Sequence, residues 1–502
     1  MNEDHCATET VQVEYHLVRQ THLSNDFEFD CIVIGAGING AGIARDAAMR
    51  GLKVLLLDKA DIASGTSSAS TRLIHGGLRY LEHFEFGLVR ESLRERETLL
   101  RIAPHLVRPL AITIPIYKHS KRGPLTIRAG MIAYDLLSTG KSLPRHRMLS
   151  PAKTLEQIPG LNRDGLLGSA VYFDAQVEFA ERLVVENVLD ARERGARVFT
   201  YAPVIKLAAE SEDVMAVEFV SDEQTHCARA RVVINAAGPW VDQLLERAPV
   251  AGSRLIGGTK GSHIVVPAFE GASSNAIYLE AQSDRRPFFI IPWNGNYLIG
   301  TTDVRFEEDP DCARSEDWEI DYLLAETNRA FPGAGLTRAS ILFTYSGVRP
   351  LPWTRNEAEQ SITRRHFIRE HPRLKNLVSI VGGKLTTYRS LAEECVDLVF
   401  RKLGRQSPPC VTAKEVLPPP VNREFADAVV HSFEHELAKT LADCFLRRTM
   451  VGLNADLGLG KLEAAVEMGK QRLGWSHERA KREVENYRDE VSKFKVAEYE
   501  PD

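Results

Sequence analysis

A strand, a glycine-rich turn and a helix follow one another near the start of this chain, and they constrain its fold more than any other feature. Residues 31–34 read CIVI, an apolar run typical of a buried parallel strand. Gly35, Gly37 and Gly40 then give the spacing G-x-G-x-x-G, a helical stretch follows, and a second apolar run ends at Asp58. This order predicts a βαβ unit that holds the pyrophosphate of a dinucleotide at a helix N-terminus.

Each residue of this motif has a physical role. Gly35 makes the tight turn, Gly37 lets the backbone approach a phosphate, and Gly40 lets the helix pack closely against the strand. Asp58 is placed to accept hydrogen bonds from a ribose. An adenosine ribose occurs in both nicotinamide and flavin cofactors, so this motif alone does not choose between them.

Three later stretches favour a long, buried flavin. Small hydroxyl residues cluster in 64–71, and the glycine-studded segment 73–80 suggests backbone pressed against a ligand. A buried strand enters the small-residue turn 235–240, and another leads through 382–389 into a helix. The alternative for the hydroxyl cluster is a flexible polar loop.

Length and composition limit the class of protein. A chain of 502 residues is too long for one core and predicts two or three domains. Its net charge of −5 argues against a generally nucleic-acid-binding surface. The seven cysteines are dispersed without metal-like spacing, which predicts free thiols in a reducing cytosol and no metal site.

The sequence contains no apolar run long enough to span a membrane and no secretory signal at its start. Segment 118–147 mixes lysine and arginine with apolar residues, a composition typical of a membrane-surface segment. A solvated basic face over a core helix explains the same composition equally well.

Eight motifs stand in one order along the chain, and together they resemble the FAD-dependent, quinone-linked glycerol-3-phosphate dehydrogenases. They are GAGINGAGIA from Gly35, SSAS from Ser67, LIHGGLRYLE from Leu73, NAAGPW from Asn235, KGSHIVV from Lys260, IGTTD from Ile299, YSGVRP from Tyr345 and GGKLTTYR from Gly382. The similarity runs from about Asp30 to Ala392, which is most of the chain.

The resemblance implies an α/β fold with a glutathione-reductase-like, Rossmann-type FAD-binding domain and a mostly antiparallel substrate-binding sheet. We expect the FAD-binding domain in 29–110, 165–250 and 340–405, and the substrate-binding domain in 111–164 and 251–339. The expected remainder is an N-terminal extension (1–28), a proline-rich linker (406–421) and a small helical C-terminal domain (422–502).

The resemblance also implies an activity and partners. The expected reaction oxidises sn-glycerol 3-phosphate to dihydroxyacetone phosphate by hydride transfer to FAD, and the electrons pass to a membrane quinone. We accordingly expect a cytoplasmic protein that associates peripherally with the membrane. Its oligomeric state stays open, with a homodimer as one possibility.

The residues expected to bind FAD lie in the matched motifs and beside them. They are Gly35, Gly37, Ile38, Asn39, Gly40, Asp58, Lys59, Thr66, Ser67, Ser68, Thr71, His75, Gly76, Gly77, Ala237, Gly238, Trp240, Gly382, Gly383, Lys384, Leu385 and Thr386. Among them His75 is expected to pack against the flavin.

Oxidation of a secondary alcohol needs a base for the hydroxyl proton and positive charge for the substrate oxygens. His263 is the first candidate for the base, because a histidine can be poised near neutral pH, and Arg349 is its rival. Lys384 is expected to act in catalysis by stabilising the anionic reduced flavin, and an ion pair with an acid is the alternative. By resemblance, the residues expected to bind substrate are Arg79, Tyr80, His263, Arg349, Arg364, Lys384 and Thr386.

Two other functions remain open at this point. A flavin oxidase of the same fold would act on another hydroxy acid or on an amine, or would use dioxygen. A non-catalytic flavin-binding or scaffold protein would not need Arg349 and Lys384, and both are present.

Overall fold

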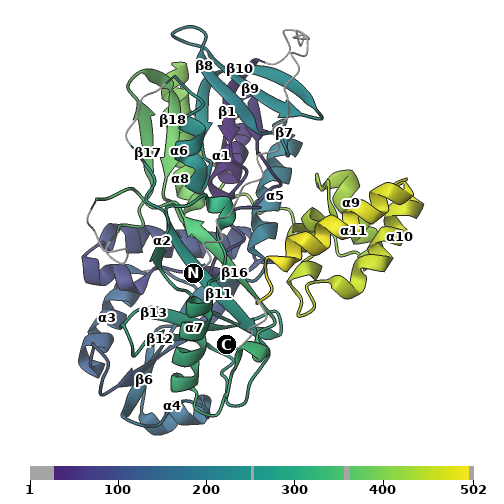
Figure 1. Cartoon of the computed structure of the whole chain (residues 1–502). Coiled ribbons are helices and arrows are strands. Elements are labelled where there is room, and N and C mark those ends of the chain that lie inside the picture. The colour runs from purple at the N-terminus through teal and green to yellow at the C-terminus, as the bar shows by residue number, and fades with distance from the viewer. Residues whose placement is uncertain (1–27, 139, 250–253, 356–361, 497–502) are drawn as a thin grey trace.

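The structure of the chain is a computed structural model that describes residues 28–138, 140–249, 254–355 and 362–496. It contains two β-sheets, each covered by helices, and a cluster of C-terminal helices beside them (Figure 1). Residues 1–27 of the expected N-terminal extension lie outside the described residues.

The first sheet is built on the predicted βαβ unit. Its strands follow the order β17-β18-β10-β1-β2-β7, and β9 and β8 extend it beyond β10 as an antiparallel arm. The pairs of β1 with β10 and β2, of β10 with β18, and of β2 with β7 are parallel. The strands are β1 (Glu28–Ile34), β2 (Val54–Leu57), β7 (Arg197–Phe199), β8 (Val204–Ala209), β9 (Met215–Ser221), β10 (Gln224–Asn235), β17 (Phe367–His371) and β18 (Leu374–Val381).

Three helices cover one face of this sheet. They are α1 (Ile38–Met49), α5 (Ala180–Glu193) and α8 (Tyr388–Leu403). Small residues on α1 let both other helices approach it closely, and Ala44 and Ala48 lie in the shared core. The carboxyl ends of β1, β10 and β18 all open toward the second sheet, which is where a parallel sheet of this kind binds its ligand (Figure 1).

The second sheet has ten strands and is almost entirely antiparallel. Its order is β15-β11-β14-β13-β12-β4-β6-β3, with β16 beside β11 and β5 beside β6. The strands are β3 (Leu73–Ile74), β4 (Val107–Tyr117), β5 (Arg147–Leu149), β6 (Leu166–Val177), β11 (Thr259–Val266), β12 (Ala276–Glu280), β13 (Pro287–Trp293), β14 (Asn296–Gly300), β15 (Val304–Arg305) and β16 (Phe343–Arg349).

Shorter elements connect the sheets and cover the second one. The 3₁₀ segment η1 follows β3 of the second sheet and leads into the long helix α2. These elements are η1 (Leu78–His83), α2 (Phe86–Ile102), α3 (Pro124–Leu137), α4 (Pro151–Gln157), η2 (Gly238–Trp240), α6 (Val241–Leu245), η3 (Pro310–Cys312), α7 (Asp317–Ala330) and η4 (Arg338–Ser340).

The C-terminal helices form a separate lobe beside α5 (Figure 1). They comprise α9 (Phe425–His435), the π-helical segment η5 (Asp443–Arg448), η6 (Val451–Leu453), η7 (Leu459–Lys461), α10 (Leu462–Arg472) and α11 (His477–Ser492). The proline-rich segment before them is extended, and part of it packs against the rest of the chain. Leu417 is buried in the core of the first sheet, and its N–H donates to the Ile102 carbonyl at 2.7 Å.

Three strands lie outside the sheet that the expected domain boundaries give them. We expected β3, β6 and β16 in the FAD-binding domain, but all three pair in the second sheet: β3 with β6, β6 with β4, and β16 with β11. β6 leads directly into α5, and α5 does pack on the first sheet. Because the two elements are adjacent in the sequence, we expected them in the same domain. We expected β16 in the FAD-binding domain because the end of this strand was predicted to approach the cofactor.

The basic and apolar segment 118–147 forms a loop, α3 and the start of β5. Two of its cations are paired: Arg122 with Glu82 and Glu280, and Lys141 with Asp135. No helix within the described ranges is both long and apolar enough to cross a membrane.

Candidate active site

The glycine turn has the geometry that its sequence predicts. Gly35 has φ of +108°, and its N–H donates to the Leu57 carbonyl at 2.7 Å. A Cβ on Gly40 would overlap the Gly35 carbonyl, so only glycine lets α1 begin this close to the turn. The Ala36 N–H donates to Asp58 Oδ2 at 2.6 Å, which ties the turn to the acid at the end of β2.

A cavity of about 650 Å³ opens at this turn. Fifteen of the residues expected to bind FAD line it, and they come from both ends of the matched region. They are Gly35, Gly37, Ile38, Asn39, Asp58, Lys59, Thr66, Ser67, Ala237, Gly238, Trp240, Gly382, Gly383, Lys384 and Leu385. The three glycine-containing segments therefore meet at one cavity.

The chemistry of this wall fits a dinucleotide. Asn39 Oδ1 and Trp240 Nε1 are buried and find no hydrogen-bond partner in the described part of the chain, so each can bond to a ligand. Lys59 Nζ lies 4.2 Å from the centre of the Trp240 ring and 2.5 Å from Asp311 Oδ2, and both charged residues line the cavity. Burial raises the pKa of Asp58 to about 6, although the N–H groups of Ala60 and Ala36 partly offset it.

A second cavity of about 320 Å³ continues from the first, because Thr66, Gly383, Lys384 and Leu385 line both. All the residues expected to bind substrate line it, together with further residues expected at the flavin. The expected residues on its wall are Thr66, Thr71, His75, Gly77, Arg79, Tyr80, His263, Arg349, Arg364, Gly383, Lys384, Leu385 and Thr386.

One carboxylate holds two of the expected substrate-binding arginines. Asp303 Oδ1 accepts from Arg349 Nη1 at 3.0 Å, and Asp303 Oδ2 accepts from Arg364 Nη2 at 2.9 Å. Burial alone would raise the pKa of Asp303, but the two guanidinium groups hold it below its ordinary value. Arg349 Nη2 also donates to Thr301 Oγ1 at 2.9 Å. The guanidinium groups are therefore fixed in direction before any substrate arrives.

His263 lies on β11, beside this pair. Its ring stacks on Tyr345 with centroids 4.9 Å apart, and its Nε2 is 3.0 Å from Thr71 Oγ1. Its Nδ1 is buried and has no hydrogen-bond partner among the described residues. Burial lowers the pKa of His263 well below its ordinary value, and the charges of Arg349 and Arg72 lower it further. These surroundings therefore favour the uncharged imidazole at neutral pH.

Lys384 lines both joined cavities. Its Nζ lies 3.9 Å from the centre of the Tyr80 ring and 3.4 Å from Ser92 Oγ. Burial lowers the pKa of Lys384. Next to it, the N–H of His75 donates to Thr386 Oγ1 at 3.2 Å, and burial lowers the pKa of His75 to about 4. His75 is thus a neutral wall residue.

Three residues expected to bind FAD line neither cavity. Gly40 packs α1 against the turn. Ser68 turns away and donates to the Ala63 carbonyl. The N–H of Gly76 donates to Tyr134 OH at 2.9 Å. In each of these three positions the polar group or the close packing serves another part of the chain.

Sequence reasoning missed Asp303 and Thr301 as site residues. Both belong to the motif IGTTD, which was noticed for its likeness to a family and not for its chemistry. The need to balance buried positive charge could have identified Asp303 from the sequence. Two arginines expected in one buried cavity need an acid between them, since unpaired buried charges are costly.

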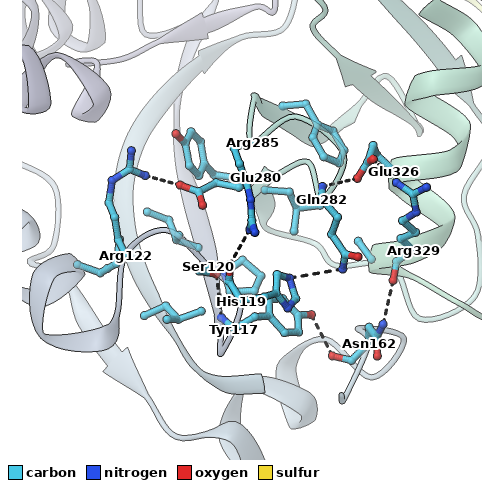
Figure 2. Close-up of a pocket in the computed structure, with 18 residues that line it drawn as sticks. Tyr117, His119, Ser120, Arg122, Asn162, Glu280, Gln282, Arg285, Glu326 and Arg329 are labelled. Atoms are coloured by element: carbon cyan, nitrogen blue, oxygen red, sulfur yellow. Dashed lines mark hydrogen bonds and ion pairs between the residues drawn. The ribbon is translucent and has the colours of Figure 1, made fainter. Parts of the chain in front are cut away.

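A third, shallow hollow lies in the second sheet's domain, between the loop after β4, β12 and α7 (Figure 2). Its volume is only about 40 Å³, and none of the expected site residues lines it. Its charged groups are already engaged: Arg122 with Glu280, Arg329 with Glu326, and Arg285 Nη1 with the His119 carbonyl at 2.6 Å. These charges are thus paired within the chain. The walls of the two joined cavities differ in that they also carry buried polar atoms with no hydrogen-bond partner among the described residues: Asn39 Oδ1, Trp240 Nε1 and His263 Nδ1.

A dinucleotide-binding sheet, a long cofactor cavity and a cationic cavity joined to it define a flavin-dependent oxidoreductase. The family model described as "FAD dependent oxidoreductase" matches residues 30–397. The chain is 44% identical to "Glycerol-3-phosphate dehydrogenase" of Synechocystis, over 94% of this chain and 98% of that one. It is 38% identical to "Glycerol-3-phosphate dehydrogenase 2" of Mycobacterium tuberculosis, over 81% and 68% respectively.

A solved structure agrees with these relatives. The glycerol-3-phosphate dehydrogenase from Bacillus halodurans complexed with FAD superposes with a TM-score of 0.76 at 28% identity, covering 95% of this chain and 97% of that one. The chain belongs to the FAD-dependent glycerol-3-phosphate dehydrogenase family, and its cofactor is FAD.

Proposed function

We propose that this chain oxidises sn-glycerol 3-phosphate to dihydroxyacetone phosphate. The observation that carries the proposal is the pair Arg349 and Arg364, which one carboxylate fixes in a cavity continuous with the FAD cavity. Planar guanidinium groups match the oxygens of phosphates and carboxylates, and two of them together suit a dianionic phosphate monoester better than an amine or a singly charged hydroxy acid. The relatives named above are themselves called glycerol-3-phosphate dehydrogenases.

Each side chain then has a defined task. Arg349 and Arg364 bind and orient the substrate oxygens, since Asp303 and Thr301 hold them in place. His263 accepts the hydroxyl proton at Nδ1, because its Nε2 is engaged with Thr71. Lys384 supplies positive charge where negative charge develops. FAD, when bound, supplies the hydride acceptor.

A substrate screen with an artificial electron acceptor tests this assignment. Turnover should be high with sn-glycerol 3-phosphate and low with glycerol, lactate and glycine, since these lack the phosphate. Turnover that favours a hydroxy acid or an amine would support the alternative oxidase instead. Oxygen consumption in the same assay distinguishes a dioxygen-using enzyme from one that needs another acceptor.

We further propose that the electrons pass to a quinone at a membrane surface. Five large apolar side chains are exposed on α2, on α3 and directly after η1: Phe84, Phe86, Leu125, Ile132 and Leu136. These three elements contact one another. Phe84 directly follows η1, and η1 carries Arg79 and Tyr80 of the substrate cavity. One short segment therefore connects this apolar patch to the substrate cavity, and Arg128 adds exposed positive charge on α3.

Charged substitutions on this patch should release the protein from lipid. Phe84 and Leu125 are 79% and 83% exposed, so Phe84→Glu with Leu125→Glu should leave the fold intact. We expect vesicle binding, measured by flotation with anionic liposomes, to fall at least about tenfold. The reason is that burying each of these apolar side chains in lipid contributes roughly 1.5–3 kcal/mol to the free energy of binding. Turnover with a soluble acceptor should not change.

The matched control is Val416→Glu with Val421→Glu. These residues are also exposed apolar side chains, but they belong to the extended segment before the C-terminal helices. Vesicle binding should survive this change. Equal loss of binding in both double variants, or no binding by the unaltered protein at low salt, would contradict the proposed surface.

A further inference from the structure

We propose that the C-terminal helices clamp the adenosine end of the FAD cavity, and that Asp61 is the positioning residue through which they do so. Asp61 contacts no expected FAD group. It lies in the loop between Asp58 and the hydroxyl cluster, and two arginines of the C-terminal lobe hold its carboxylate.

The contact between loop and lobe is fully buried. Asp61 Oδ2 accepts from Arg447 Nε at 2.5 Å and from Arg448 Nη1 at 2.8 Å, while Oδ1 accepts from Arg448 Nη2 at 2.7 Å. Burial alone would raise the pKa of Asp61, but Arg448 and Arg447 lower it, so the carboxylate is charged. Charge-assisted, bidentate contacts of this kind fix direction as well as position.

The loop that carries Asp61 shapes the cofactor wall on both sides of it. On one side, the Ala60 N–H donates to Asp58 Oδ1 at 2.9 Å. On the other side, the Ala63 N–H donates to the Ala36 carbonyl in the glycine turn at 3.1 Å. A shift of Asp61 would therefore move both the ribose-facing acid and the turn that receives the pyrophosphate.

The lobe also holds the segment that backs onto Asp58. The Tyr201 and Ala202 N–H groups donate to the carbonyls of Ala60 and Asp58 at 2.9 and 2.7 Å. Tyr201 OH in turn donates to Asp443 Oδ1 of the lobe at 2.7 Å. Arg447 Nη2 donates to the same Asp443 oxygen at 2.7 Å, so one network joins both attachments.

The end of the lobe reaches the cavity itself. Glu490 of α11 and Lys493, which directly follows α11, line the FAD cavity. The Thr344 N–H donates to the Phe494 carbonyl at 2.7 Å, which fastens this end to β16. Because the lobe contacts the loop, its backing segment and the cavity rim, FAD binding and docking of the lobe should strengthen each other.

The test is the rate at which FAD leaves the full-length holoenzyme carrying Asp61→Asn, followed by the rise of flavin fluorescence after dilution. We expect release at least about tenfold faster than in the unaltered protein. The matched control is Glu436→Gln, which breaks another buried ion pair between lobe and first sheet, with Arg182 on α5, away from the FAD cavity. It should lower the melting temperature without accelerating FAD release.

A second variant keeps the proposal testable if Asp61→Asn does not fold. Arg448→Lys retains the positive charge but loses the planar guanidinium group that makes two hydrogen bonds with the carboxylate. It should therefore also accelerate FAD release. In both variants, turnover at saturating FAD should recover, because the cationic cavity is intact. Unchanged release in Asp61→Asn and Arg448→Lys would overturn the proposal, as would equally fast release in Glu436→Gln.

Discussion

Replacing His263 by alanine should reduce turnover by about 10²- to 10⁴-fold, the range that a positioned general base contributes. FAD should stay bound, because His263 lies in the substrate cavity and not on the FAD cavity wall. The physical reason is the state of the ring. The ring is neutral and its Nδ1 has no hydrogen-bond partner among the described residues, so this lone pair is available for the hydroxyl proton of the substrate. Steady-state kinetics and the flavin content of the purified variant measure both expectations.

A matched control distinguishes catalysis from stability. His371 is also a buried histidine with a lowered pKa, but it bonds to Ser379 Oγ in the first sheet and lines neither cavity. His371→Ala should cost stability and leave turnover per bound FAD unchanged. Near-normal turnover in His263→Ala would remove His263 as the base and favour Arg349.

Replacing Arg349 by lysine should lower kcat/KM by about tenfold to a hundredfold, mainly through KM. A lysine keeps the positive charge but cannot hold Asp303 and Thr301 while presenting a second planar face to the substrate. A hydrogen bond to a charged group contributes about 1.5–3 kcal/mol, and 1.4 kcal/mol corresponds to a factor of ten. Substrate-concentration curves with an artificial acceptor give both parameters.

Two further variants sharpen this prediction. Asp303→Asn should raise KM in the same direction, because both guanidinium groups lose the carboxylate that orients them. Arg365 is exposed, directly follows Arg364 in the sequence and does not line the cavity. Arg365→Lys should therefore leave the kinetics unchanged. Unaltered kcat and KM in Arg349→Lys would show that this guanidinium does not bind the substrate.

The sequence predicts the cofactor side of this protein well, because that side is built from local patterns. Gly35, Gly40 and Asp58 have roles that follow from backbone geometry over fewer than thirty residues, and the structure places them accordingly. The strand-turn segments at Asn235 and Gly382 are equally local, and they meet at the same cavity.

The substrate side depends on contacts between distant residues, which spacing does not reveal. Asp303 lies 46 residues from Arg349 and 61 from Arg364, so nothing in the local sequence marks it as their shared partner. The lowered pKa of His263 likewise arises from burial and from Arg349 and Arg72, which only the folded chain brings near it. The ion pair between Asp61 and Arg447 likewise joins residues that are 386 positions apart in the sequence.

Anaerobic mixing of the purified holoenzyme with sn-glycerol 3-phosphate tests the central claim most directly. We predict that the visible absorbance of the oxidised flavin disappears and that one dihydroxyacetone phosphate forms for each FAD reduced. Glycerol, which lacks the phosphate, should leave the flavin oxidised. Flavin that stays oxidised with sn-glycerol 3-phosphate, or that glycerol reduces equally fast, would contradict the assignment of this cationic cavity to a phosphorylated alcohol.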